Sequence, residues 1–166
     1  MRVKTKRNFI LQQGFEEPSP AVCPRQYSAL HFQGRVVFVF IVAGIVFQSA
    51  PLFYVLCAVL WWSALLPQLN PFDAIYNATF GRRAGAFHLT PAPAPRRTAQ
   101  SMAGAFALAC GLLIHFGFLM AAYIVEGMFL GAVLALILGG FCVGSFVYYL
   151  VRGKGAFGRQ TLPWAS

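Results

Sequence analysis

The chain has 166 residues, of which 58% are hydrophobic and only 10% are charged, and its mean hydropathy is +0.65. This composition excludes an ordinary soluble domain and predicts an integral membrane protein. The formal net charge of +9 does not indicate nucleic-acid binding, because the basic residues flank apolar blocks and form no single basic surface.

Two apolar blocks dominate the sequence, one from Ala29 to Leu66 and one from Ser101 to Val151. A single helix over the second block would be ~75 Å long, whereas the hydrocarbon core of a bilayer is ~30 Å thick. Each block is therefore predicted to form a helical hairpin, which makes the fold all-α with four transmembrane helices.

Local sequence signals divide each block. Pro51 follows a polar stretch and suits the first turn of a new helix, and the pair Glu126-Gly127 interrupts the second block. These breaks predict helices near residues 29–48, 51–66, 99–124 and 128–151.

The lysines and arginines test this topology independently. All 13 lie in the stretch from the N-terminus through Arg35, in the middle loop or in the tail, and the two predicted hairpin turns hold none. By the positive-inside rule, both termini and the middle loop are expected on the cytoplasmic side of a bacterial inner membrane. The predicted order is a cytoplasmic segment (1–28), a hairpin (29–66), a connector (67–98), a second hairpin (99–151) and a cytoplasmic tail (152–166).

The connector contains the stretch "LPQLNPFDAIYNATFGRR", which predicts a short helix over residues 70–80. Asn70 is a good N-cap, Pro71 fits the first helical position and Gly81 can end the helix. Four apolar side chains share one face, and two arginines follow the helix: Phe72, Ile75, Tyr76 and Phe80, then Arg82 and Arg83. The helix is expected in the membrane interface, with the arginines near anionic lipid headgroups; alternatively, it only covers the bundle.

Three short elements give the chain a family resemblance: "NPFDAIY", "PAPRRTAQSMAGAF" and "FCVGSFVYYL". They resemble the small bacterial membrane proteins of the domain of unknown function 4395 family, in which a Pro-Arg-aromatic-Ala-Gln element precedes the third span and a Phe-Cys-x-Gly-Cys element ends the fourth. Thr98 stands here in place of the aromatic residue, and Ser145 in place of the second cysteine. The matching residues are Pro95, Arg97, Ala99, Gln100, Phe141, Cys142 and Gly144. The resemblance implies an architecture and brings no established activity.

Cysteine chemistry is one candidate function. A Cys-x-x-Cys pair could cycle between dithiol and disulfide, but Cys142 has Ser145 at the second position. Cys110 and Cys142 lie ~21 Å from the predicted outer turn on neighbouring helices, so they could meet. The alternative is that both are inert buried side chains. Together with Cys23 and Cys57, they show neither zinc-ligand spacing nor the pattern of a disulfide framework.

His115 is the second candidate site, because an ionisable residue in a predicted span is costly. It is interpreted as a histidine hydrogen-bonded between helices, as an axial ligand of a haem or chlorophyll-type pigment, or as a proton-relay group. Two rows of small residues, which allow helices to approach closely, are predicted to pack the bundle: Ala103, Ala107 and Gly111, and Gly131, Ala135 and Gly139.

The sequence shows no Ser-His-Asp set, paired carboxylates, phosphate-binding loop or metal-ligand cluster, so an enzyme is not favoured and no cofactor is required. We expect a non-catalytic accessory or scaffolding subunit of a larger respiratory, photosynthetic or transport assembly. Its partners would be lipids and either other proteins or further copies of the chain. The alternatives are a membrane thiol protein that uses Cys142 and a pigment-binding subunit that uses His115.

Overall fold

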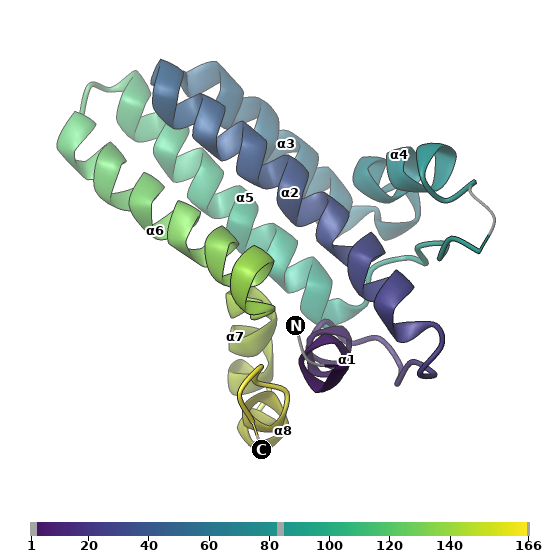
Figure 1. The fold of residues 1–166 in the computed structure, drawn as a ribbon. Coiled ribbons are helices and arrows are strands. Elements are labelled where there is room, and N and C mark those ends of the chain that lie inside the picture. Colours follow the sequence, from purple (N-terminus) through teal and green to yellow (C-terminus); the bar gives the residue numbers. More distant parts are fainter. Residues whose placement is uncertain (1–2, 83–84, 166) are drawn as a thin grey trace.

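A computed structural model describes residues 3–82 and 85–165, and this part of the chain is all-helical. Its elements are α1 (Val3–Gln12), α2 (Cys23–Phe47), α3 (Ala50–Leu65), the 3-10 helix η1 (Pro67–Leu69), α4 (Pro71–Thr79), α5 (Ala94–His115), α6 (Leu119–Gly139), α7 (Val143–Val151) and α8 (Gly155–Gln160). Helices α2, α3, α5 and α6 lie side by side as an antiparallel bundle, with the α2–α3 and α5–α6 turns at the same end (Figure 1).

Three helices, α2, α5 and α6, are long and apolar enough to cross a membrane. The fourth bundle helix, α3, is apolar but has only 16 residues. The turn of the first hairpin lies where it was predicted, at Gln48 and Ser49, and Pro51 occupies the first turn of α3. Helix α2, however, begins at Cys23, whereas its predicted start was residue 29. Gln48 adopts a left-handed conformation with φ of 43°, which reverses the chain.

The predicted break at Glu126-Gly127 is wrong, because both residues lie inside α6. The turn of the second hairpin instead follows His115 and centres on Gly117, whose φ is +76°. The Gly117 N–H donates to Ile114 O at 3.0 Å, and the Phe118 N–H donates to Leu113 O at 2.8 Å. These two bonds form a Schellman C-cap, which ends α5. The predicted third helix, 99–124, is therefore α5 over 94–115.

The predicted fourth helix, 128–151, is two helices. Gly140 takes a left-handed conformation with φ of 64° and ends α6, and α7 begins at Val143. Figure 1 shows α7 leaving the end of α6 at a steep angle, with α8 following it. Residues after Gly140 therefore turn back against the start of α5 and do not continue the bundle.

The core of the bundle is apolar and closely packed. Phe53, Leu56 and Leu60 of α3 are at most 2% exposed, as are Ile41 of α2 and Phe129 of α6. They belong to one cluster of buried side chains that spans all four bundle helices. Close helix approach, rather than exclusion of water, is what holds such a bundle together in lipid.

A second cluster of buried side chains lies at the end of the bundle opposite the hairpin turns. We call this end the basic end of the bundle. Phe9 and Ile10 of α1 are fully buried there with Leu30 of α2 and Cys142. The Asn8 side chain donates to Leu162 O at 3.1 Å, which ties α1 to the C-terminal segment. The N-terminal segment, predicted only as cytoplasmic, is thus a packed part of the fold.

The described lysines and arginines all lie toward this basic end. They occur in α1, in the first half of α2, in the connector, at the start of α5 and after α7, and the described turn residues 48–49 and 116–118 contain none. The charge asymmetry seen in the sequence is therefore an asymmetry of the folded bundle.

Candidate functional site

Arg96 is the centre of a buried polar cluster at the basic end of the bundle. It is 3% exposed and lies in the first turn of α5. Its Nη2 atom donates to Asp73 Oδ1 at 2.7 Å and to Gln33 Oε1 at 3.0 Å, and its Nη1 atom lies 3.3 Å from Asp73 Oδ2. The cluster therefore joins α5 to α2 and to the connector helix α4.

The arginine fixes the orientation of two glutamines. A guanidinium can only donate, so Gln33 must turn its amide oxygen toward Arg96. The Gln100 Nε2 atom donates to the same oxygen at 3.0 Å, which leaves Gln100 Oε1 as the end without a partner among the described atoms. Gln13 Oε1, at the end of α1, is likewise buried and unpaired.

Asp73 and Asn70 complete the cluster at the start of α4. The Asn70 Oδ1 atom accepts from the Phe72 N–H at 3.1 Å, so Asn70 caps α4, and its Nδ2 atom donates to Asp73 Oδ2 at 2.8 Å. Asp73 is 7% exposed. Its pairing with Arg96 turns this carboxylate toward the bundle.

The predicted apolar face of α4 is divided between two surroundings. Phe72 is 5% exposed and belongs to the bundle core, and Tyr76 packs on Phe32 of α2 with ring centroids 5.5 Å apart. Ile75 and Phe80 are 54% and 42% exposed. Arg82 is exposed, and Arg83 lies outside the described residues.

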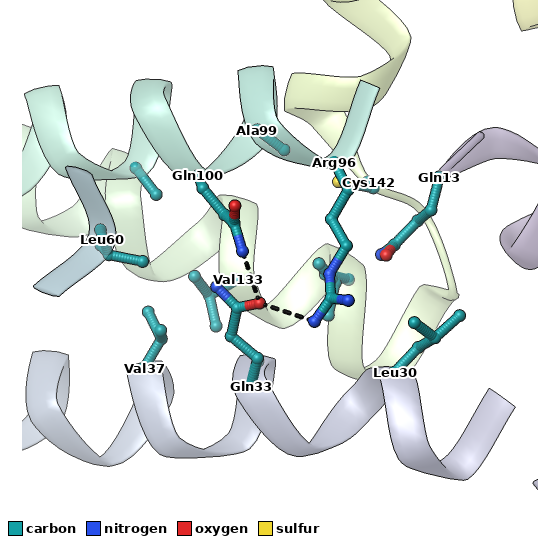
Figure 2. A pocket seen from close by; sticks show the side chains of 13 residues that line it. Gln13, Leu30, Gln33, Val37, Leu60, Arg96, Ala99, Gln100, Val133 and Cys142 are labelled. Carbon is teal, nitrogen blue, oxygen red and sulfur yellow. Dashed lines mark hydrogen bonds between the residues drawn. The ribbon is translucent and has the colours of Figure 1, made fainter. Parts of the chain in front are cut away.

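A cavity of about 80 Å³ adjoins the cluster (Figure 2). Apolar side chains of α2, α3, α5 and α6 form most of its wall, and Arg96, Gln33, Gln100, Gln13 and Cys142 form its polar part. In Figure 2 the Gln13 side chain extends toward Arg96 from the α1 side. A water molecule needs about 10–15 Å³ and two or more polar partners, so this space is suited to a few waters or a small polar molecule.

Cys142 lies beyond the end of α6, at the N-cap position of α7, and is 4% exposed. The Ser145 hydroxyl donates to Cys142 Sγ at 3.3 Å, and the Cys142 N–H donates to Gln12 Oε1 at 2.8 Å. Burial raises the pKa of the Cys142 thiol, and the bond from Ser145 opposes this rise only in part. The thiol is therefore protected and mostly protonated at neutral pH.

The two cysteines proposed as a pair have different surroundings. Cys110 belongs to the core of the bundle, whereas Cys142 belongs to the second cluster at the basic end. All four cysteines are free and buried. A redox pair of Cys110 and Cys142 would therefore require the two clusters to rearrange.

His115 is the last residue of α5 and is exposed at the hairpin turn, not in the middle of a span. Its ring centroid lies 6.4 Å from that of Tyr54 and 5.2 Å from that of Phe116. Within residues 3–82 and 85–165 there is no group of three His, Cys, Asp or Glu side chains that could hold a metal ion. Pigment binding through His115 stays a prediction.

The two rows of small residues also differ. On α5, Ala107 and Gly111 are buried, and a Cβ atom at Gly111 would meet the ring of Tyr54 on α3; Ala103 is partly buried beside them. On α6, a Cβ atom at Gly131 or Gly139 would meet nothing within 4 Å, and Ala135 lies half-buried between them. The α6 row was expected to pack inside the bundle, but its glycines face outward.

The two sequence elements at 95–100 and 141–145 meet in the fold. A Cβ atom at Gly144 would lie 2.5 Å from the Cα atom of Ala99, so α7 touches the α5 backbone directly. The Ser145 hydroxyl lies 3.3 Å from Pro95 O. Arg97, from the same element, donates from Nε to Ala64 O at 2.7 Å and satisfies a carbonyl at the end of α3.

The sequence pointed to Gln100 only through the family element and did not indicate a buried cluster around Arg96. Arg96 and Gln100 are four residues apart and so share one helix face, and two polar residues on one face of an apolar helix are a signal of a polar contact. Sequence reasoning also missed His31, which is 2% exposed, with Nδ1 2.9 Å from Tyr27 O and Nε2 3.2 Å from Leu136 O. His31 thereby links α2 to α6.

One family model, described as Domain of unknown function (DUF4395), matches residues 27–152. The match runs from the first turns of α2 to the end of α7 and includes Asp73, Arg96, Gln100 and Cys142. No curated protein and no solved structure matches the chain.

Proposed function

The chain belongs to the DUF4395 family, and we propose that it is a four-span protein of the bacterial cytoplasmic membrane that serves as a non-catalytic accessory or scaffolding subunit of a larger assembly. In this proposal α2, α3, α5 and α6 each cross the membrane, and α4 lies at the cytoplasmic interface. Both termini are cytoplasmic, as the concentration of basic residues at one end of the bundle favours.

The outward face of α6 is the observation that carries this proposal. Gly127, Gly131 and Gly139 are exposed, and the space beside each is open. With Ala135 they form a row with four-residue spacing on a helix that can cross a membrane. Small residues in such a row let another helix approach its backbone closely. We therefore propose that α6 binds a transmembrane helix of a partner subunit.

The Arg96 cluster supports a structural role. Its charges are paired with each other, and its bonds connect α2, α4 and α5. A catalytic cluster would be expected to present at least one unpaired, perturbed group to a substrate site. The unpaired atoms here are amide oxygens, which are neutral acceptors.

Helix α3 is proposed as the fourth span although it is short. Its 16 residues extend ~24 Å, which is less than the ~30 Å hydrocarbon core. Trp61 and Trp62 near its end are suited to a membrane interface, and each indole N–H donates to a backbone carbonyl at 3.1 Å. Local bilayer thinning of a few Å would accommodate the difference.

Topology is tested with single cysteines in a variant whose four native cysteines are replaced by alanine or serine. We expect a membrane-impermeant maleimide to label Ser49→Cys and Gly117→Cys from the periplasmic side of intact cells. Arg82→Cys and Gly153→Cys should react only after the membrane is opened. Labelling of Ser49→Cys and Gly117→Cys from opposite sides would refute the four-span arrangement.

Association through α6 is tested by native mass spectrometry of gently extracted membranes. Gly131→Val fills the outward groove and should release a partner subunit that accompanies the wild-type chain. Ala105→Val is the matched control, because Ala105 is an exposed small residue on α5. If the wild-type chain is isolated only as a monomer, or if Ala105→Val releases the partner equally, the accessory role is refuted.

A second candidate function, a membrane thiol protein, is favoured by one observation: Cys142 lines the cavity beside Arg96 and accepts a hydrogen bond from Ser145. A small thiol reagent that enters this cavity should then label Cys142 in native membranes faster than Cys57, which is equally buried but does not line the cavity. If Cys142 stays unlabelled and unoxidised in cells, and Cys142→Ala leaves growth and assembly unchanged, the thiol function is excluded.

A further inference from the structure

A second, larger cavity lies between α2 and α4 at the basic end of the bundle. Its volume is about 390 Å³, within the usual range for small-ligand sites. The wall comprises Arg25, Ser28, Phe32 and Arg35 of α2, Tyr76 and Phe80 of α4, and connector residues 85–87. We call it the α2–α4 pocket; it shares no lining residue with the cavity beside Cys142.

The pocket carries uncompensated positive charge. Arg25 and Arg35 are both exposed, and neither forms an ion pair with any carboxylate in the described part of the chain. No acidic residue lines the pocket. The connector runs beside Arg25, because a Cβ atom at Gly85 would lie 3.1 Å from Arg25 Nη1. A guanidinium held in a pocket without a carboxylate is a site for an external anion.

The α2 residues of the pocket follow one another at helical spacing. Arg25, Phe32 and Arg35 lie at i, i+7 and i+10 and so project toward the same side of α2. The two arginines are ~15 Å apart along the helix axis, at opposite ends of the pocket. Between them, Phe32 packs on Tyr76 and Phe80, with centroid distances of 5.5 and 5.8 Å. The pocket therefore combines two cationic ends with an aromatic wall.

From this arrangement we infer that the α2–α4 pocket binds the phosphate group of an anionic phospholipid. Guanidinium groups bind phosphate oxygens through paired, charge-assisted hydrogen bonds, and the aromatic wall offers apolar surface for the first carbons of a lipid. A free phosphate ester would use the same arginines but would make no use of the apolar surface of Phe32 and Tyr76 in this pocket.

The position of Arg35 assigns the lipid. It directly precedes the continuous apolar run 36–47 of α2, so its flexible side chain can extend toward the lipid phosphates at this end of the span, and Arg25 lies ~15 Å farther along the helix axis from the membrane centre. The phosphate is held at Arg35, and the outer part of the headgroup extends toward Arg25. The choice of a phospholipid rather than a free phosphate ester rests on the proposed membrane placement of α2 and α4. Anion binding by the arginine pair does not depend on that placement.

Native mass spectrometry of the detergent-purified full chain tests the inference, with added phosphatidylglycerol, phosphatidylcholine or inorganic phosphate. We expect phosphatidylglycerol to form a one-to-one complex. Arg35→Gln should weaken it at least about tenfold, because each charged hydrogen bond lost is worth that much or more. Arg25→Gln should weaken it further in the double variant. Arg159→Gln is the matched control, since it removes an exposed arginine outside the pocket.

Each result decides for or against the inference. Equal binding of phosphatidylcholine, or equal weakening by Arg159→Gln, would overturn it. If inorganic phosphate competes fully and shows the same dependence on Arg25 and Arg35, the anion site stands but the lipid source is refuted. Unchanged thermal unfolding of the variants shows that they fold. Labelling of Ser49→Cys and Gly117→Cys reports topology separately, so a failure of the four-span proposal is recognised independently.

Discussion

Removal of the Arg96 guanidinium is the most direct test of the buried cluster. In Arg96→Met, Asp73 loses its bonds to Nη1 and Nη2 and keeps only the 2.8 Å bond from Asn70. Gln33 loses one of its two donors but keeps Gln100. The variant therefore leaves a carboxylate that is 7% exposed without a counter-charge.

The size of the effect follows from the ion pair being buried. Removing one partner of a buried pair costs about 3–5 kcal/mol, because the remaining charge is uncompensated. Replacing both partners with apolar side chains of similar size is neutral or stabilising in comparable cases. We therefore expect Arg96→Met to be destabilised by about 3–5 kcal/mol and the double variant Arg96→Met/Asp73→Leu to recover at least about half of this loss.

The assay is equilibrium unfolding in mixed micelles of mild detergent and SDS, followed by helical circular dichroism, for wild type, both single variants and the double variant. The quantity of interest is the coupling free energy of the cycle. A coupling below about 0.5 kcal/mol, or a double variant as unstable as the sum of the single variants, would refute the view that this pair clamps α4 to the bundle.

Three further predictions concern the α5–α7 contact and its thiol. Gly144→Ala should destabilise the fold by about 1–3 kcal/mol in the same unfolding assay, because the new Cβ atom would meet the Ala99 backbone. Gly127 faces open space, so Gly127→Ala should stabilise the fold by up to about 1 kcal/mol. Ser145→Cys places a second sulfur next to Cys142, since the present Oγ–Sγ distance is 3.3 Å, so mild oxidation should form a 142–145 disulfide detectable by mass spectrometry; persistence of two free thiols would contradict this geometry. Burial raises the pKa of the Cys142 thiol, so the rate of its alkylation should still be rising at pH 9. The alkylation rate of an ordinary cysteine, with a pKa of about 8.5, is levelling off at that pH. A plateau of the Cys142 rate below pH 9 would contradict a raised pKa.

The first hairpin could be predicted from sequence because its signals are local and agree. A polar stretch precedes Pro51, and continuous apolar segments lie on either side of it, so turn and helices follow from neighbouring residues. In the second block the signals compete. Glu126-Gly127 looks like a break, but a glycine is tolerated inside a helix, and Glu126 is covered by the fold and contacts Gln48, whose Nε2 atom lies 3.2 Å from its carboxylate. The second block is instead interrupted at Gly117, which has apolar neighbours suited to a Schellman cap.

The Arg96 cluster could not be predicted in the same way, because it depends on contacts between distant segments. Asp73 and Arg96 are 23 residues apart, and Gln33 and Arg96 are 63 apart. A single sequence shows that each is polar but not which of them meet. The cap on α4 was predictable from Asn70 and Pro71, yet the direction of Asp73 was not, since its partner lies on another helix.

Two of the elements that carry the family resemblance, 95–100 and 141–145, are best explained as a packing contact between α5 and α7. Pro95 and Ala99 on α5 face Gly144 and Ser145 on α7, and the contact at Gly144 leaves no room for a side chain. A glycine at such a backbone contact, and a hydroxyl that reaches a carbonyl of the facing helix, are requirements of packing. This accounts for why Ser145 can stand where a second cysteine is expected: its Oγ atom lies 3.3 Å from both Pro95 O and Cys142 Sγ, and its single proton can be donated to either acceptor without any redox chemistry. The same reasoning favours a structural role for the region over a catalytic one.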